Sequence, residues 1–244
     1  MKNLLLLILF ITMPLSAQKK PTLYLIGDST MAEKVNPETN PEYGWGQMIH
    51  QFFQSNIKIE NHAVNGRSTK SFIDEGRWEK IYDKLKPNDV VIIQFGHNDQ
   101  KTEDPSRYTI PTTSYKENLK KFIRDIREKK AFPILLTSIA RRNFNEKGVL
   151  IDSHGLYPLV VEQVAFQNNV AFIDAYALTE DLELMYGPEA SKILHLHFKP
   201  NEHPYYPDGK QDDTHLSALG ASFVSERIIK ELKKIKTPLT PYFK

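Results

Sequence analysis

The chain has 244 residues, of which 40% are hydrophobic and 25% are charged, and its formal net charge is +2. This is the composition of an ordinary globular protein, and a charge so close to neutral gives no indication of the concentrated basic face that electrostatic nucleic-acid binding requires. The absence of cysteine excludes disulfides, thiolate metal sites and a lipid-modified cysteine.

The N-terminal segment has the layout of a secretory signal peptide. Lys2 precedes an apolar run over 4–13, and Ser16-Ala17 provides the small residues of a cleavage site. The run is too short for a stable bilayer-spanning helix, so we expect no membrane association after cleavage; a retained anchor is the alternative. The sequence therefore predicts a signal peptide over 1–17, export to the periplasm or the extracellular space, and one domain over 18–244.

Short apolar runs predict five β-strands. Apart from the shorter segment 57–60, they are largely apolar along their length, which is typical of parallel strands covered on both faces. In chain order the runs span 23–26, 57–60, 90–95, 134–138 and 170–173.

Helical segments lie between these strands. The clearest spans 114–130 and has Leu119, Phe122, Ile123 and Ile126 on one face, with basic residues opposite. The other predicted helices span 45–54, 157–167 and 217–234, the last with Ser217 as its N-cap.

The alternation of strands and helices predicts an α/β fold. We expect a three-layer α/β/α sandwich of the flavodoxin-like type, with a central parallel five-stranded sheet and a ligand site at the carboxyl ends of the strands. The polar segment 191–211, rich in histidine, proline and tyrosine, predicts a long loop.

Four polar blocks fall on this expected edge of the sheet. Ser29 follows the first strand, Gly66 the second and Asn98 the third, while Asp212 and His215 precede the final helix. Each block alone has an ordinary structural explanation: a turn, a helix cap or a salt bridge at a helix entry. Together they provide every group that acyl transfer needs.

The roles follow from the chemistry of each group. The hydroxyl of Ser29 needs a base, and the imidazole of His215 is the candidate, because histidine is the usual general base near neutral pH. A carboxylate would orient that imidazole and stabilise its charged form; Asp212 and Asp213 are the two candidates. The backbone N–H groups of Ser29 and Gly66 and the side-chain amide of Asn98 would donate to the oxyanion of the tetrahedral intermediate.

The four blocks, Gly-Asp-Ser, Gly, Gly-x-Asn-Asp and Asp-x-x-His, resemble those of the SGNH (GDSL-type) hydrolase superfamily and occur in its order. The stretches at 27–32, 44–47, 65–68, 95–99 and 212–215 are similar to those of rhamnogalacturonan acetylesterases. This resemblance implies the SGNH hydrolase fold and a secreted esterase without a metal or other cofactor. It also implies Ser29 as nucleophile, His215 as base, and Asp212 rather than Asp213 as the orienting carboxylate.

The expected partner is an acetylated polysaccharide or oligosaccharide. Aromatic and basic side chains near the predicted edge are candidates for binding this substrate. The alternative for the tryptophans Trp45 and Trp78 is packing in the core. The alternative for basic residues such as Lys70 and Arg77 is a solvated surface. The candidates that we select are Tyr43, Trp45, Arg67, His97 and His197.

The 191–211 segment contains His195, His197 and His203, and the His-x-His spacing of the first two would permit a metal ion as the alternative. Because their order and spacing match no metal motif, we predict no metal and expect these histidines to line or cover the substrate cleft. The leading hypothesis is a serine esterase that removes acetyl groups from rhamnogalacturonan. A xylan or oligosaccharide acetylesterase, a lipase or thioesterase, and a non-catalytic carbohydrate-binding protein are the alternatives.

Overall fold

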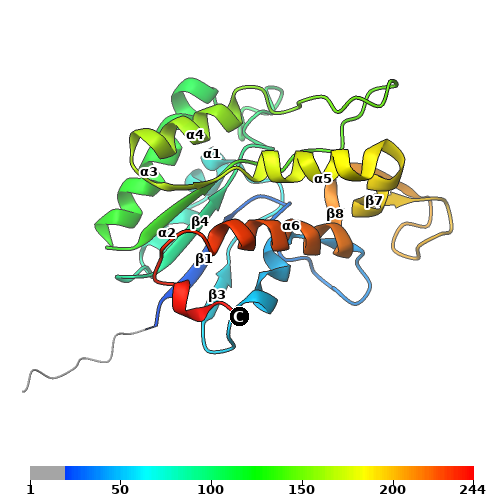
Figure 1. Ribbon diagram of the computed structural model, residues 1–244. Coiled ribbons are helices and arrows are strands. Elements are labelled where there is room, and N and C mark those ends of the chain that lie inside the picture. Colours follow the sequence, from blue (N-terminus) through cyan, green and yellow to red (C-terminus); the bar gives the residue numbers. More distant parts are fainter. Residues whose placement is uncertain (1–19) are drawn as a thin grey trace, which may run out of the picture.

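The computed structural model of the protein describes residues 20–244, so the predicted signal peptide over 1–17 lies outside the described residues. A five-stranded parallel sheet forms the centre of the fold, in the order β3-β1-β4-β5-β6 (Figure 1). The fold predicted from the sequence is confirmed. The strands are β1 (Thr22–Gly27), β3 (Lys58–Asn61), β4 (Val90–Gln94), β5 (Phe132–Leu136) and β6 (Ala171–Ile173).

Helices cover both faces of this sheet because successive strand residues point to opposite sides. On one face Leu25 and Ile92 pack against one group of helices, and on the other Ile26 and Ile93 pack against a second group. The first group is η1 (Trp45–Phe52, a 3₁₀ helix), α5 (Ala175–Ala190) and α6 (Ala218–Leu232). The second is α1 (Thr69–Asp74), α2 (Arg77–Tyr82), α3 (Lys116–Glu128) and α4 (Tyr157–Gln167).

The structure can be compared with the sequence prediction helix by helix. In α3 the four apolar residues of the predicted stripe are all buried, and the short π-helical turn η2 (Pro111–Tyr115) precedes it. In α6 the hydroxyl of Ser217 accepts a hydrogen bond from the Gly220 N–H and caps the helix as predicted. The predicted helix over 45–54 is a 3₁₀ helix instead of an α-helix.

A second, smaller sheet was not predicted. It is antiparallel, in the order β2-β8-β7, and lies at one end of the molecule (Figure 1). Its strands are β2 (Glu42–Tyr43), β7 (His195–Phe198) and β8 (Lys210–Ser217). The prediction of one long loop over 191–211 is therefore wrong, because the short helix η3 (Ser191–Leu194) and β7 occupy its first part and β8 begins at its end.

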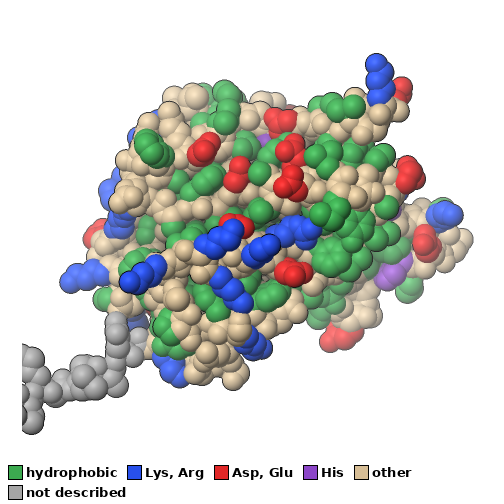
Figure 2. Space-filling view, viewed as in Figure 1, with side chains coloured by type: hydrophobic (Ala, Val, Ile, Leu, Met, Phe, Trp, Pro, Cys, Tyr) green, Lys and Arg blue, Asp and Glu red, His purple; other side chains and the backbone are tan. Residues whose placement is uncertain are grey.

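Acidic and basic side chains are interspersed over the face that carries α5 and α6 (Figure 2). A last 3₁₀ turn, η4 (Thr240–Tyr242), returns the chain to η1, where Phe243 packs on Phe53.

Within residues 20–244, no helix combines the length and apolar character needed to cross a bilayer.

Candidate active site

The turn after β1 fixes Ser29 at the carboxyl edge of the large sheet. The carboxylate of Asp28 accepts hydrogen bonds from the N–H and hydroxyl of Thr30, at 3.0 and 2.8 Å, and closes the turn. At Gly27 a Cβ atom would lie 2.6 Å from the carbonyl oxygen of Gln94, so only glycine lets the turn approach β4 this closely. The Ser29 side chain is thereby held at the end of the strand, with 8% of the residue exposed.

A hydrogen-bonded chain links Ser29 to β8 of the small sheet. The Ser29 hydroxyl lies 2.9 Å from Nε2 of His215, and Nδ1 of the same ring lies 2.9 Å from Oδ2 of Asp212. The N–H of Thr214 and that of His215 donate to Oδ1 of Asp212, at 3.0 and 2.9 Å. Burial alone would raise the pKa of Asp212, but the bonds from His215 and these amides hold it well below its usual range. Asp212 is therefore ionised throughout the pH range in which histidine side chains usually titrate.

Asp213 has different partners. Its Oδ1 accepts from Nη1 of Arg142 at 2.6 Å and lies 2.7 Å from Nε2 of His197. A backbone bond of 2.9 Å from the Arg142 N–H to the Asp213 carbonyl oxygen adds to the contact. Of the two carboxylates that sequence leaves in competition, Asp212 faces the imidazole and Asp213 helps to fasten β8 to the segment after β5.

The two loops expected to complete the oxyanion hole lie against the turn that carries Ser29 and against each other. The Val64 N–H donates to the Gly27 carbonyl oxygen at 3.0 Å, which brings the loop after β3 beside β1. Gly66 in that loop has φ +77°, a value that L side chains rarely adopt. Nδ2 of Asn98 donates to the Arg67 carbonyl oxygen at 3.1 Å and so joins the loop after β4 to the loop after β3.

Lys34 is a buried cation that sequence reasoning missed. Its side chain is 2% exposed, and its Nζ lies 2.5 Å from the carbonyl oxygen of Ser29 and 2.9 Å from Oδ1 of Asn65. It also lies 2.8 Å from the carboxylate of Glu42 on β2. One ammonium group thus connects the turn that carries Ser29, the loop that carries Gly66 and the small sheet, and a lysine carries enough donors to do so. The only available signal was its position five residues after Ser29.

Two buried groups support the loop after β4. His97, 3% exposed, has Nδ1 at 3.1 Å from Asp28 and Nε2 at 3.2 Å from the Ile139 carbonyl oxygen. The carboxylate of Asp99 accepts from the N–H and hydroxyl of Thr69 and from the hydroxyl of Thr109. Burial raises the pKa of Asp99 to about 7 in spite of these donors. These contacts tie the loop after β4 to the start of α1.

Two of the expected substrate-binding side chains are inaccessible. Trp45 is fully buried in the core, and its Nε1 donates to Oε1 of Gln94 at 2.6 Å. Trp78 is 2% exposed and packs on Phe122, so core packing describes both tryptophans. His97 is 3% exposed and is held between Asp28 and the Ile139 carbonyl oxygen. The assignment of Trp45 and His97 to substrate binding is therefore wrong for this conformation, since neither side chain presents a surface to a ligand.

The remaining substrate-binding candidates are at least partly accessible. Tyr43 lies on β2 opposite Leu216, the neighbour of His215, and its hydroxyl donates to the Pro37 carbonyl oxygen. The His197 side chain is 15% exposed and is held by Asp213. Arg67 lies beside Gly66, where its Nε is 3.1 Å from the carboxylate of Glu75.

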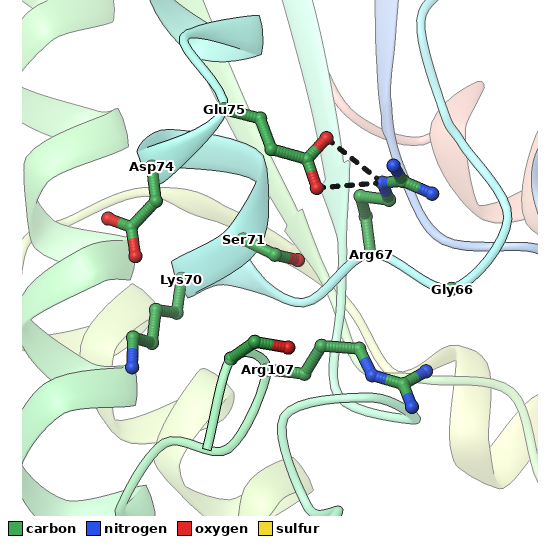
Figure 3. A pocket seen from close by; sticks show the side chains of 8 residues that line it. Gly66, Arg67, Lys70, Ser71, Asp74, Glu75 and Arg107 are labelled. Carbon is green, nitrogen blue, oxygen red and sulfur yellow. Dashed lines mark hydrogen bonds and ion pairs between the residues drawn. The ribbon is translucent and has the colours of Figure 1, made fainter. Parts of the chain in front are cut away.

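A pocket of about 440 Å³ opens next to the Gly66 loop (Figure 3). Three basic side chains, Arg67, Lys70 and Arg107, line it together with the carboxylates of Asp74 and Glu75. Figure 3 shows the side chains of Arg67 and Arg107 approaching the pocket from different loops, with Gly66 nearby. The pocket can accept an anionic or polar group beside Gly66.

The histidines of the 191–211 segment do not gather into one cluster. His195 is buried, with Nε2 at 2.7 Å from Glu183 and Nδ1 at 3.1 Å from the His215 carbonyl oxygen, so it does not line a cleft as predicted. His203 packs on Phe198 and Tyr206. Across residues 20–244, no three His, Asp or Glu side chains are grouped so that they could hold a metal ion.

An α/β/α sandwich with a serine, a histidine and an aspartate in one hydrogen-bonded chain at the carboxyl edge of its sheet has the architecture of a serine ester hydrolase. Residues 25–222 match the family described as GDSL-like Lipase/Acylhydrolase, and the chain belongs to this family.

Named relatives cover almost the whole chain. Rhamnogalacturonan acetylesterase RhgT of Bacillus subtilis is 41% identical over 222 residues, which are 91% of this chain and 94% of that protein. The probable rhamnogalacturonan acetylesterase YesY of the same organism is 35% identical, over 89% and 95% of the two chains. The solved structure of YxiM from B. subtilis has a TM-score of 0.74 at 24% identity, and the match covers 88% of this chain and 57% of that one.

Proposed function

We propose that the protein removes acetyl groups from acetylated rhamnogalacturonan through an acyl-enzyme on Ser29. The observation that carries this proposal is the unbroken chain from the Ser29 hydroxyl through His215 to Asp212, with both links at 2.9 Å. The 41% identity to a rhamnogalacturonan acetylesterase supports the choice of substrate. The basic side chains beside Gly66 fit a polymer that contains galacturonate carboxylates.

In the proposed reaction His215 takes the proton of Ser29 as the hydroxyl oxygen attacks the acetyl carbonyl carbon. The charged imidazole then faces ionised Asp212, and the oxyanion is stabilised by the N–H groups of Ser29 and Gly66 and by the Asn98 amide. His215 returns the proton to the departing sugar oxygen. Water, activated by the same imidazole, releases acetate and restores Ser29.

Acetate release tests both parts of the proposal. We expect faster release from acetylated rhamnogalacturonan than from acetylated xylan or acetylated homogalacturonan, and faster cleavage of 4-nitrophenyl acetate than of 4-nitrophenyl octanoate. Ser29→Ala is expected to abolish all of these activities while leaving the circular dichroism spectrum intact. Full activity in Ser29→Ala would refute the mechanism, whereas a preference for xylan or for octanoate would refute the substrate and leave the mechanism standing.

We further propose that residues 1–17 direct export and are removed. Lys2, the apolar run over 4–13 and Ser16-Ala17 support this proposal. Mass spectrometry of protein recovered from the periplasm or the medium is expected to find a chain that begins at Gln18. An intact N-terminus held in the membrane fraction would support a retained anchor instead.

A further inference from the structure

The amide of Asn98 can contribute to an oxyanion hole in only one of its two orientations. Its nitrogen donates hydrogen bonds and its oxygen accepts them, so a half-turn of the amide would present an oxygen to the developing negative charge. Nδ2 has two hydrogens, and one of them is used by the Arg67 carbonyl oxygen at 3.1 Å. The second hydrogen remains for a substrate oxygen. Whatever fixes the amide plane therefore determines whether this donor is available.

Arg107 provides that constraint. Its Nη1 donates to Oδ1 of Asn98 at 3.2 Å, on the opposite side of the amide from the bond to Arg67. A guanidinium group carries donors and no acceptor, so a rotated amide would place N–H against N–H. The Arg67 carbonyl would then face the amide oxygen as well. Both neighbours of Asn98 consequently favour the same orientation.

The guanidinium group is itself fixed in place. Nε of Arg107 lies 2.6 Å from Oδ2 of Asp104, and the N–H and hydroxyl of Ser106 donate to Oδ1 of the same carboxylate at 3.1 and 2.5 Å. The Ser106 hydroxyl and Arg107 lower the pKa of Asp104, so the pair is charged at neutral pH. The Arg107 N–H also donates to the Asp104 carbonyl oxygen at 3.0 Å. A short turn thus holds both the side chain and its counterion.

The same nitrogen lies beside a second expected donor. A Cβ atom built on Gly66 would lie 3.7 Å from Nη1 of Arg107, and no other atom outside the neighbouring residues comes within 4 Å of it. Figure 3 shows the Arg107 side chain extending from its own loop toward the part of the pocket where Gly66 lies. One guanidinium nitrogen is therefore close to two of the three groups expected to bind the oxyanion.

We propose that Arg107 is a positioning residue for the reaction, which holds the Asn98 amide with its N–H directed at the oxyanion. This inference rests on the proposed acyl transfer at Ser29 but adds a residue that no catalytic motif contains. It differs from a role for Arg107 in binding a substrate carboxylate, because a positioning role affects small neutral esters as much as acidic polymers.

A double-mutant cycle on 4-nitrophenyl acetate separates these roles, because this substrate has no carboxylate. Arg107→Gln is expected to lower kcat about tenfold and to change KM less than twofold, which is the size expected for losing a hydrogen bond to a charged group. Asn98→Ala is expected to lower kcat by about 10²-fold or more. In the Asn98→Ala background, Arg107→Gln is expected to have almost no further effect. Arg127→Gln, which removes an arginine whose Nη2 donates to the carbonyls of Asn168 and Asn169, serves as the matched control.

An unchanged kcat in Arg107→Gln would overturn the inference, as would an equal loss in both backgrounds. If Arg107→Gln lacks the native circular dichroism spectrum, Asp104→Asn provides the test, because it releases the guanidinium group without removing it. The expected result is a smaller loss of kcat that again disappears in the Asn98→Ala background. Loss of activity in Ser29→Ala together with an unaffected Arg107→Gln would reject this inference alone, whereas an active Ser29→Ala would reject the proposed function itself.

Discussion

Every residue of β4 in the large sheet is buried, whereas β8 in the small sheet has a single buried residue, Leu216, among its eight. The large sheet is held by aliphatic side chains packed on both faces, and it carries the turns of Ser29, Gly66 and Asn98. The small sheet carries His215 and Asp212. Charged contacts join it to the rest of the molecule, from Lys34 to Glu42 and from Arg142 to Asp213.

The difference shows that the candidate nucleophile and base depend on different forces. Ser29 is placed by the core, but the distance of 2.9 Å to His215 depends on how the small sheet is fastened to the large one. Substitutions in the charged contacts should therefore affect catalysis more than their distance from the reacting atoms suggests, and substitutions within the large sheet should mainly affect stability.

Asp212→Asn is expected to produce the largest effect, a loss of about 10³–10⁴-fold in kcat, because a neutral amide neither holds the imidazole tautomer nor stabilises its charged form. The matched control is Asp213→Asn, one residue away on the same strand, which should lower kcat less than about tenfold. The rate of 4-nitrophenyl acetate hydrolysis measures both. Equal losses in the two variants would mean that β8 has been disturbed as a whole and that Asp212 has no special role.

Lys34→Met tests the Lys34–Glu42 ion pair, which connects the two sheets. Removing one partner of a buried ion pair leaves Glu42 uncompensated, so we expect a loss of roughly 3–5 kcal/mol in the free energy of unfolding. We also expect a drop of about tenfold in kcat, because Ser29 and Asn65 lose a shared donor. Urea denaturation and esterase kinetics measure the two effects.

Lys58→Met is the matched control for Lys34→Met. Lys58 lies 2.5 Å from the carboxylate of Glu60, but its side chain is 70% exposed, so its removal should cost less than about 1 kcal/mol. A similar loss in the free energy of unfolding for both variants would show that the Lys34–Glu42 ion pair contributes no more than an ordinary surface pair.

Asp99→Asn is expected to change the pH dependence of stability. Because burial raises the pKa of Asp99 from 3.8 to about 7, the folded protein binds more protons than the unfolded chain between these values. The stability that this group contributes is complete at low pH and is lost as pH rises to about 7, by at most about 1.4 kcal/mol per pH unit. Relative to Asp99→Asn, the wild type should therefore lose stability over this range. Urea denaturation from pH 4.5 to 8 measures the free energy of unfolding of both proteins. Parallel pH profiles of that free energy would contradict the prediction.

The large sheet could be predicted from sequence because most of its strands contain continuous apolar runs such as 90–93, which differ sharply from the polar segments around them. The small sheet could not. Its strand β2 has only two residues, and β8 consists mostly of charged and polar residues that are half exposed. Neither gives an apolar signal, and their pairing joins residues more than 170 positions apart, such as Tyr43 and Leu216.

Some residues of the candidate site could likewise be predicted from sequence and others could not. Ser29, Asp212 and His215 fall in short motifs, and the structure brings them into contact. Lys34 and Arg107 belong to no motif, because a single lysine or arginine is usually a solvated surface residue and their contacts arise only on folding. The aromatic candidate Trp45 was misassigned because an indole that stacks on sugars and one that fills a core look alike in a sequence.

The way β8 is attached has a practical consequence for handling the protein. The strand that carries His215 is fastened by ion pairs and hydrogen bonds, and the whole chain contains no cysteine that could replace or compete with them. Thiol reductants and oxidants therefore have no covalent link to break or to form. No disulfide therefore has to form for β8 to reach its place beside Ser29, whether the chain folds in a reducing or an oxidising medium.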